Sequence, residues 1–260
     1  GRMRRVEPTI SDEYFCDIKM DGLACALVYE DGMLMQAVTR GDSRVGEDVT
    51  MNVRTIQNVP LRLRENDDYA HFLRGRTEIR GEIVMYKKDF ETLNASREAA
   101  GLSLFKNPRN LAAGTIRQLD PSLVAARPLH FLGYDIIRDT PEDIPTIAYG
   151  YAAIAALGIA TSRQTQAVRG VDEIVEYIEH LGKIREGLAF NTDGAVVKLN
   201  DRAQFAQLGV VGKTPRAAVA YKFAAEEATT IVKDIVISIG RTGAATPVAV
   251  FDPVQVAGTT

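Results

Sequence analysis

The segment Asp17-Ile18-Lys19-Met20-Asp21-Gly22 holds the residues of greatest chemical interest in this chain. A lysine ends an apolar run, and a carboxylate and a glycine follow it closely. A lysine amine that loses its proton in a partly buried, cation-rich setting is a nucleophile. Taken alone, such a short segment is more often an ordinary hairpin with a surface lysine, so other motifs must decide between the two interpretations.

A β-strand is expected over residues 15–20 because the run is apolar, and Gly22 would allow a tight turn after it. The next apolar run, residues 23–29, would pair back antiparallel on the first strand. This hairpin would place Lys19 in a cleft beside the turn, with Asp21 nearby.

The two cysteines, Cys16 and Cys25, would then lie on adjacent strands. Two thiols neither form a zinc site nor indicate an oxidising compartment. We interpret both cysteines as small core residues.

Four further residues could serve the same chemistry as Lys19. Arg40 follows an expected strand, where its guanidinium could reach a phosphate or a sugar. Glu82 stands at another strand end, where it could accept hydrogen bonds from ribose hydroxyls or could simply be solvated. Lys198 and Lys222 alternate with apolar strand residues. The ammonium group of such a lysine either extends into solvent or takes part in a functional site. Together and in this order, the motifs favour one shared site.

The first half of the chain is predicted to be rich in β-structure. Residues 24–29 and 33–39 flank Glu30-Asp31-Gly32, and an Asp-Gly between two such runs is a strong hairpin signal. Further strands are expected at residues 77–85, 129–137, 194–199 and 217–224. Helices are expected at residues 89–100, 147–157 and 171–182, with Asp89 as the N-cap of the first, Gly101 as its stop and Gly182 as the stop of the last.

The residue pattern of the sequence changes near Ala228. Two β-like runs, residues 231–239 and 247–256, are separated by Gly240-Arg241-Thr242-Gly243. We therefore expect one domain over residues 1–227 and the start of an all-β domain over residues 228–260, which is too short to close a barrel of its own.

Composition gives a broad class. The chain has 260 residues, of which 46% are hydrophobic and 25% charged, as in soluble globular proteins. The net charge of −3 gives no global sign of nucleic-acid binding, although Arg2, Arg4 and Arg5, or Lys106 and Arg109, could form local patches. The sequence shows neither an apolar run long enough to span a membrane nor a signal peptide, so a cytoplasmic protein without a membrane partner is expected.

The ordered motifs resemble those of the covalent nucleotidyltransferases, which include DNA ligases, RNA ligases and mRNA capping enzymes. The resemblance is strongest to the bacterial NAD-dependent DNA ligases, and it covers nearly the whole chain. It is carried by Lys19-Met20-Asp21-Gly22 and by residues 37–42, 46–50, 52–56, 107–121 and 240–243. The implied fold is α+β: antiparallel sheets with flanking helices, followed by the first strands of an OB-fold barrel.

The resemblance also implies roles for individual residues. Lys19 would attack the α-phosphorus of NAD, form a lysyl-AMP phosphoramidate and release nicotinamide mononucleotide, with Asp21 in support. Arg40 and Glu82 would hold the ribose. Tyr134 would stack on the adenine, although a core aromatic is the simpler alternative for it.

Other matched positions concern the phosphates, the base and the DNA. Lys198 and Lys222 would stabilise the phosphate during transfer, and Asp193 would orient the lysine or a metal. Asp17 and Ile18 would contact the nucleotide. Arginines near the phosphates and the nick would be Arg109, Arg117, Arg185 and Arg241.

Three departures from the family pattern are visible. Asp17 stands where the family usually has a glutamate, and its shorter side chain would lengthen a contact to the adenine. The loop over residues 41–46 differs from the family in its middle, and residues 223–225 lack a typical proline. None of the three removes a charged catalytic group.

The implied cofactors are NAD and Mg²⁺, and the implied partner is nicked double-stranded DNA in the full-length enzyme, which we expect to be monomeric. The family's small helical domain and its zinc-finger, helix-hairpin-helix and BRCT modules are not in this sequence, so we expect a fragment with little nick-sealing activity of its own. Two alternatives stay open: an ATP-dependent or other covalent nucleotidyltransferase, and a non-catalytic module that binds AMP or DNA.

Overall fold

The computed structural model describes residues 7–41, 45–212, 214–224, 227–254 and 256. The basic residues Arg2, Arg4 and Arg5, and the loop residues 42–44, therefore lie outside the described part. The chain divides into two compact units, Gly1–Phe223 and Ala224–Thr260.

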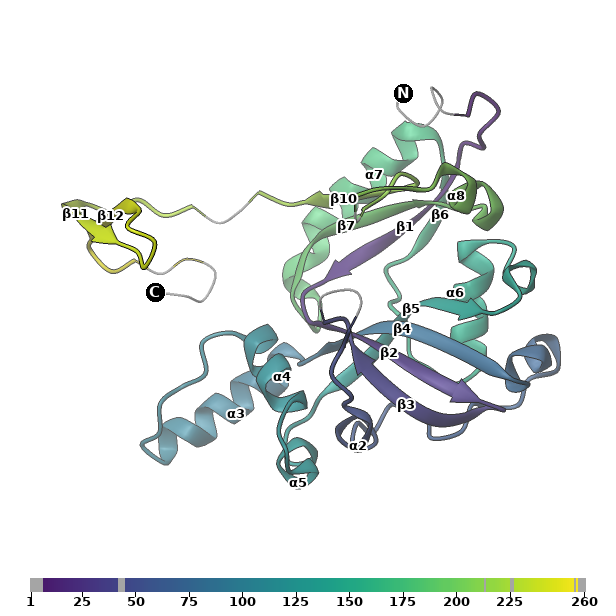
Figure 1. Cartoon of the computed structure of the whole chain (residues 1–260), viewed down its shortest axis with the longest axis horizontal. Coiled ribbons are helices and arrows are strands. Elements are labelled where there is room, and N and C mark those ends of the chain that lie inside the picture. The colour runs from purple at the N-terminus through teal and green to yellow at the C-terminus, as the bar shows by residue number, and fades with distance from the viewer. Residues whose placement is uncertain (1–6, 42–44, 213, 225–226, 255, 257–260) are drawn as a thin grey trace. The chain divides into compact units, whose positions relative to one another are not determined.

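One four-stranded sheet in the first unit, which we call the first sheet, carries the Lys19 segment (Figure 1). Its strand order is β10-β7-β1-β6, and all neighbours pair antiparallel. The strands are β1 Glu13–Met20, β6 Gln166–Arg169, β7 Thr192–Leu199 and β10 Ala218–Lys222. Both edges of β1 are thus occupied by strands from the second half of the chain.

The second sheet has the order β3-β2-β4-β5 and is also antiparallel. Its strands are β2 Leu23–Glu30, β3 Met33–Thr39, β4 Arg76–Val84 and β5 His130–Arg138. The predicted β2–β3 hairpin is confirmed: Asp31 and Gly32 have φ of 47° and 75°, the left-handed geometry of a tight hairpin turn.

The predicted pairing of residues 15–20 with residues 23–29 is wrong, because β1 and β2 lie in different sheets. The chain passes from the first sheet to the second at Gly22, where a Cβ would lie 2.4 Å from the carbonyl oxygen of Ile83. The glycine is therefore needed for the close passage over β4. Cys16 and Cys25, expected on adjacent strands, are both buried but in separate sheets.

The expected helices at residues 147–157 and 171–182 are confirmed, whereas α2, α4, α5 and α8 were not expected. Asn107 is the N-cap of α4, because its side-chain oxygen accepts hydrogen bonds from the backbone amides of Arg109 and Asn110. A proline follows it at the first helical position. The helices are α2 Thr50–Val53, α3 Lys87–Ala99, α4 Pro108–Ile116, α5 Pro121–Ala125, α6 Ile147–Ala156, α7 Gly170–Ile184 and α8 Arg202–Leu208. Short 3₁₀ turns (Asp67–Leu73, Pro141–Asp143, Arg185–Gly187) and the two-residue strands β8 Val210–Val211 and β9 Thr214–Pro215 complete the unit.

Two expected helix boundaries are wrong. Helix α3 begins two residues before Asp89, whose carboxylate lies 3.1 Å from Nε2 of His130 instead of capping the helix. Gly101 does end this helix, with φ of 66°. Helix α7 runs through Gly182 and ends at Ile184, so this glycine does not stop the helix.

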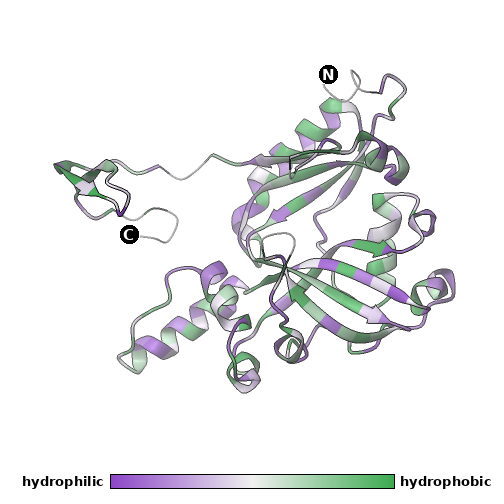
Figure 2. Ribbon diagram, in the orientation of Figure 1, coloured by the Kyte–Doolittle hydropathy of each residue, from purple (hydrophilic) through white to green (hydrophobic). Residues whose placement is uncertain are grey.

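Helix α6 fixes the two sheets to each other. Its residues Ile147 and Tyr151 pack beside Phe15 of the first sheet. Its residues Ala153 and Ile154 belong to the large apolar core of the second sheet. Figure 2 shows apolar residues alternating with polar ones along the strands of both sheets, which is the pattern of sheets with two different faces.

The second unit contains an antiparallel hairpin of β11 Val232–Ile239 and β12 Ala245–Phe251, turned at residues 240–243. The expected second strand, residues 247–256, was wrong at both ends. The bond from the Gly240 amide to the Ala244 carbonyl closes the turn directly before Ala245, and Pro253 has no amide to continue the ladder. Across the described residues, none of the helices combines the length and the apolar character needed to cross a membrane.

Candidate active site

Lys19 and Lys222 lie in one row across the first sheet. Side chains alternate along a strand, so Phe15, Asp17 and Lys19 share one face of β1. In the strand register Lys19 lies opposite Gly194 of β7, and Gly194 lies opposite Lys222 of β10. The two lysines therefore project from the same face on either side of a glycine.

Gly194 is required for this row. A Cβ at this position would lie only 1.8 Å from the carbonyl oxygen of Tyr221. Strand β10 can therefore lie against β7, and bring Lys222 into the row, only if residue 194 has no side chain.

Asp193 is the carboxylate that joins the two lysines. Nζ of Lys19 lies 3.0 Å from both carboxylate oxygens, and Nζ of Lys222 lies 4.0 Å from one of them. The side chain of Lys19 is 29% exposed, whereas that of Lys222 is 70% exposed. Asp21, expected beside Lys19, instead pairs with Arg109 of α4 at 2.9 Å.

Glu82 of the second sheet lies in the field of this cluster. Burial raises the pKa of its carboxyl to about 7, and Asp21 raises it as well. Lys19 and Arg109 oppose the rise, as does the hydrogen bond from the Gly22 amide. The two sheets thus bring Lys19, Asp21, Glu82 and Arg109 into one electrostatic cluster, which with Asp193 and Lys222 we call the lysine row.

A second group of site residues lies farther along β1. Lys198 is opposite Phe15 in the register, four positions from Lys19, which is about 13 Å at 3.3 Å per residue. Its ammonium lies 5.4 Å from the ring centre of Tyr134 and 5.8 Å from that of Tyr151, and it donates to the Tyr134 carbonyl at 3.3 Å. The register therefore separates Lys198 from the lysine row.

Asp17 is almost fully buried beside this group, at 2% exposure. Its carboxylate accepts hydrogen bonds from the hydroxyl of Tyr151 and, at 2.8 Å, from the amide of Ile18. Burial raises the pKa of Asp17, and Lys198, Tyr151 and the Ile18 amide act against that rise. We call Asp17, Tyr134, Tyr151 and Lys198 the tyrosine group.

Tyr134 links this group to both expected ribose residues. Burial raises the pKa of its phenol, with Glu82 and Asp135 adding to the rise and Arg80 and Arg40 opposing it. Arg40 follows β3 as an exposed residue, and its charge reaches Tyr134.

Several predicted residues stand apart from both groups. Arg117 pairs with Glu47 at 2.7 Å. The guanidinium of Arg185 pairs with its neighbour Glu186 and lies 5.1 Å from the ring centre of Phe223. Ile18 is buried with Tyr177 and Leu181 of α7, on the face of β1 opposite Lys19. Arg241 belongs to the second unit, which is described by itself.

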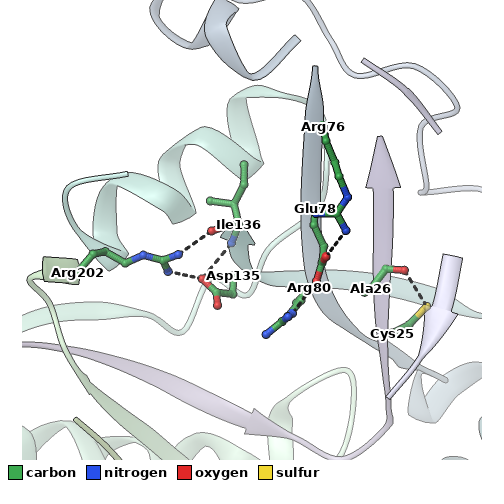
Figure 3. A network of polar contacts seen from close by, with 8 residues as sticks. All are labelled: Cys25, Ala26, Arg76, Glu78, Arg80, Asp135, Ile136 and Arg202. Atoms are coloured by element: carbon green, nitrogen blue, oxygen red, sulfur yellow. Dashed lines mark hydrogen bonds and ion pairs between the residues drawn. The ribbon is translucent and has the colours of Figure 1, made fainter. Parts of the chain in front are cut away.

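Sequence reasoning missed a network of ion pairs on β4 and its neighbours (Figure 3). Glu78 is held by Arg76 at 2.7 Å and by Arg80 at 2.8 Å. Burial raises the pKa of Glu78, but these two arginines bring it below its usual value overall. Arg202 of α8 pairs with Asp135 of β5 and so holds the strand beside Tyr134. The alternation Glu78, Arg80, Glu82 was the available signal for a polar face on β4.

Tyr151 was also missed. It lies in the alanine-rich run of α6, which the sequence indicates as a core helix. Only its contact with Asp17, a residue far away in the sequence, marks it as part of the site.

The two antiparallel sheets with their flanking helices form an α+β fold of the nucleotidyltransferase type. The family model described as "NAD-dependent DNA ligase adenylation domain" matches residues 1–226, and that described as "NAD-dependent DNA ligase OB-fold domain" matches residues 229–260. The chain belongs to the NAD-dependent DNA ligase family.

Curated relatives agree with this assignment. The chain is 45% identical over 258 residues to a DNA ligase of Thermomicrobium roseum, 42% over 259 residues to one of Listeria monocytogenes and 43% over 259 residues to one of Anoxybacillus flavithermus. The matches cover 98–99% of this chain but 37% of each relative. Among solved structures, an archaeal ATP-dependent RNA ligase has a TM-score of 0.47 and 16% identity, and the match covers 84% of this chain and 44% of that one.

Proposed function

We propose that this chain is the adenylation core of an NAD-dependent DNA ligase and that Lys19 is its nucleophile. The observation that carries the proposal is the contact between Lys19 and Asp193 in a row that also holds Lys222. A lysine held by a carboxylate beside a second cation suits attack on a phosphate, whose developing charge fixed cations stabilise.

The proposed step conserves atoms and electrons. The lone pair of neutral Lys19 Nζ forms a bond to the adenylyl phosphorus of NAD, and the bond from that phosphorus to the nicotinamide mononucleotide oxygen breaks. Asp193, 3.0 Å from Nζ, is the nearest acceptor for the proton that the amine gives up. Lys222 would neutralise charge on the phosphate oxygens.

The tyrosine group would bind the adenine. Tyr134 offers an aromatic face, and Asp17 and Lys198 offer an acceptor and a donor beside it. Lys198, predicted to act on the phosphate, lies about 13 Å along the strand from Lys19, so we assign it to the base instead. Glu82 and Arg40 both act electrostatically on the phenol of Tyr134, and we assign them to the ribose. Ile18 would contribute through its backbone only.

We propose that Mg²⁺ assists the attack of Lys19 on the adenylyl phosphorus. Within the described residues no group of three or more histidine, cysteine or carboxylate ligands gathers into a metal site. Mg²⁺ often takes only one or two carboxylates together with substrate phosphates and water. Asp21 and Glu82 fit that need, because their mutual repulsion contributes to the raised pKa of Glu82 and a cation would relieve it. When bound there, the ion would supply charge neutralisation at the phosphate.

In the longer ligase we propose that AMP passes from Lys19 to the 5′-phosphate of nicked double-stranded DNA. Four arginines would serve that stage: Arg109 of the lysine row, and Arg117, Arg185 and Arg241 outside both site groups. We further propose a cytoplasmic monomer, in keeping with a DNA substrate, and a domain boundary at residues 227/228, between the ranges of the two matching family models.

The test is covalent labelling followed by intact-mass measurement. The chain is incubated with Mg²⁺ and either NAD or ATP carrying a labelled adenylate. We expect one adenylyl group per chain from NAD, and none in Lys19→Ala or Lys19→Arg, because a guanidinium stays protonated. Lys183→Ala, at an exposed lysine of α7, is the matched control. Labelling from ATP alone would favour an ATP-dependent enzyme, and undiminished labelling of Lys19→Ala would remove the assignment.

A further inference from the structure

One contact in the first unit joins two buried side chains, Asp17, which has an expected role at the nucleotide, and Tyr151, which has none. Asp17 is 2% exposed and Tyr151 is 6% exposed, and the tyrosine hydroxyl donates to the aspartate carboxylate. One residue comes from β1 and the other from α6, so the tertiary fold alone brings them together.

We propose that Tyr151 is a positioning residue that holds Asp17 as an oriented carboxylate and thereby sets the preference of the site for adenine over a 6-oxopurine. The inference rests on the proposed adenosine site. Tyr151 would act through Asp17 and would not touch the base itself.

The geometry leaves Asp17 able to accept one more hydrogen bond on each side. One carboxylate oxygen is engaged by the Ile18 amide and the other by Tyr151. Each oxygen of an ionised carboxylate has two acceptor sites. The two protein donors therefore fix the plane of the carboxylate and leave acceptor capacity for a ligand.

Asp17 must stay ionised if its carboxylate is to act only as a hydrogen-bond acceptor toward a bound base. A buried carboxylate tends to take up a proton, and burial does raise the pKa of Asp17. Lys198 and the Tyr151 hydroxyl oppose this tendency. Without the hydroxyl, a larger fraction of Asp17 would carry a proton and would become a donor.

The pair of Asp17 and Lys198 distinguishes purines by polarity. Adenine presents an amino donor at position 6 and an acceptor at N1, which match an acceptor-only carboxylate and a donor-only ammonium. Hypoxanthine presents the reverse, an acceptor at position 6 and a donor at N1. A protonated Asp17 could donate to the oxygen of hypoxanthine, so loss of Tyr151 should relax the discrimination.

A purely structural role for Tyr151 makes a different prediction. If the tyrosine only packs against Phe15, with ring centres 4.7 Å apart, then losing its hydroxyl would lower stability without changing base selectivity. The ratio of AMP to IMP affinity therefore separates the two roles.

The experiment measures binding of AMP and IMP by calorimetry to the full chain, cleared of bound adenylate with nicotinamide mononucleotide. We expect Tyr151→Phe to lower the AMP-to-IMP ratio about tenfold or more, the scale of one hydrogen bond to a charged group. Tyr149→Phe is the matched control on the same helix, because its ring packs against Tyr69 instead. We expect this control to keep the AMP-to-IMP affinity ratio of the parent.

A second comparison tests whether the effect of Tyr151→Phe depends on the Asp17 carboxylate. In Asp17→Asn, which has no carboxylate to orient, adding Tyr151→Phe should change the ratio less than about threefold, as expected when the coupled partner is gone. An unchanged ratio in folded Tyr151→Phe, an equal effect in both backgrounds, or a parent that binds AMP and IMP alike would overturn the proposal. Failure of NAD to label Lys19 would instead count against the proposed function, since binding is measured separately.

Discussion

Lys19 and Lys222 of the lysine row share one face of the first sheet with Asp17 and Lys198 of the tyrosine group. The two groups differ in exposure and in their partners. In the lysine row the side chains of Lys19 and Asp193 are 29% and 33% exposed, and that of Lys222 is 70% exposed. In the tyrosine group Asp17 is 2% exposed, and its carboxylate accepts hydrogen bonds from the Tyr151 hydroxyl and the Ile18 amide.

This difference matches two chemical tasks. A nucleophile that must lose a proton and meet a phosphate needs charged partners and access to solvent. A group that reads the polarity of a base needs a dry setting, where an unmatched donor or acceptor is costly. Variants that affect one region but not the other are therefore the sharpest tests of the division.

The largest effect is expected from Gly194→Ala. The new Cβ would lie 1.8 Å from the Tyr221 carbonyl, so β10 must move away from β7 and take Lys222 with it. We expect a loss of about 1–3 kcal/mol or more in the free energy of unfolding and no measurable labelling of Lys19. Urea denaturation and intact mass check both. Gly187→Ala, where a Cβ would meet nothing within 4 Å, is the control; equal labelling of the two variants would contradict the arrangement.

The next effect compares the two lysines. Lys198→Met should weaken AMP binding about tenfold or more, because it removes a charged donor beside Tyr134 and leaves Asp17 without its cation. Lys222→Met should slow labelling of Lys19 while AMP affinity stays within about threefold of the parent, since its exposed ammonium lies at the other end. Calorimetry and labelling rates measure the two. The reverse pattern would place Lys198 on the phosphate after all.

A smaller effect concerns pH and Glu82. Its pKa is raised from 4.5 to about 7 in the folded chain, so the unfolded state gives up this proton first as pH rises. The protonated Glu82 carboxyl therefore stabilises the folded state fully below pH 4.5, and this contribution is lost as pH rises through about 7. Over that range the free energy of unfolding falls by at most about 1.4 kcal/mol per pH unit. Glu82→Gln should flatten this decline in urea denaturation series. Glu65→Gln, whose side chain was 81% exposed, should keep it; an identical slope in all three proteins would refute the shift.

Short-range patterns predicted much of the site. Lys19, Lys198 and Lys222 stand out because each interrupts an apolar alternation, and Asp31-Gly32 predicts its hairpin from local backbone geometry alone. The family resemblance supplied the α+β fold, which the sheets and helices confirm. What these features have in common is that neighbours in sequence determine them.

Partner choice between distant segments was not predictable in the same way. The alternation in β1 says which residues share a face but not that β6 and β7 occupy its edges, so the β1–β2 pairing was wrong. Register then decides that Lys198 lies opposite Phe15 and not beside Lys19. Tyr151 was missed for the same reason, since an alanine-rich helix gives no sign of a buried aspartate from another sheet.

The smallest effect is expected from Glu47→Gln, which tests whether a third charged region is independent of the two site groups. Glu47 pairs with Arg117 at 2.7 Å, but the side chains are 61% and 48% exposed. An exposed pair contributes little, so the free energy of unfolding should stay within about 0.5 kcal/mol of the parent. AMP affinity and labelling of Lys19 should also match the parent, as measured by calorimetry and intact mass. A loss above about 1 kcal/mol, or a changed affinity for AMP, would show that this pair supports the lysine row through α4 and would erase the separation between the regions.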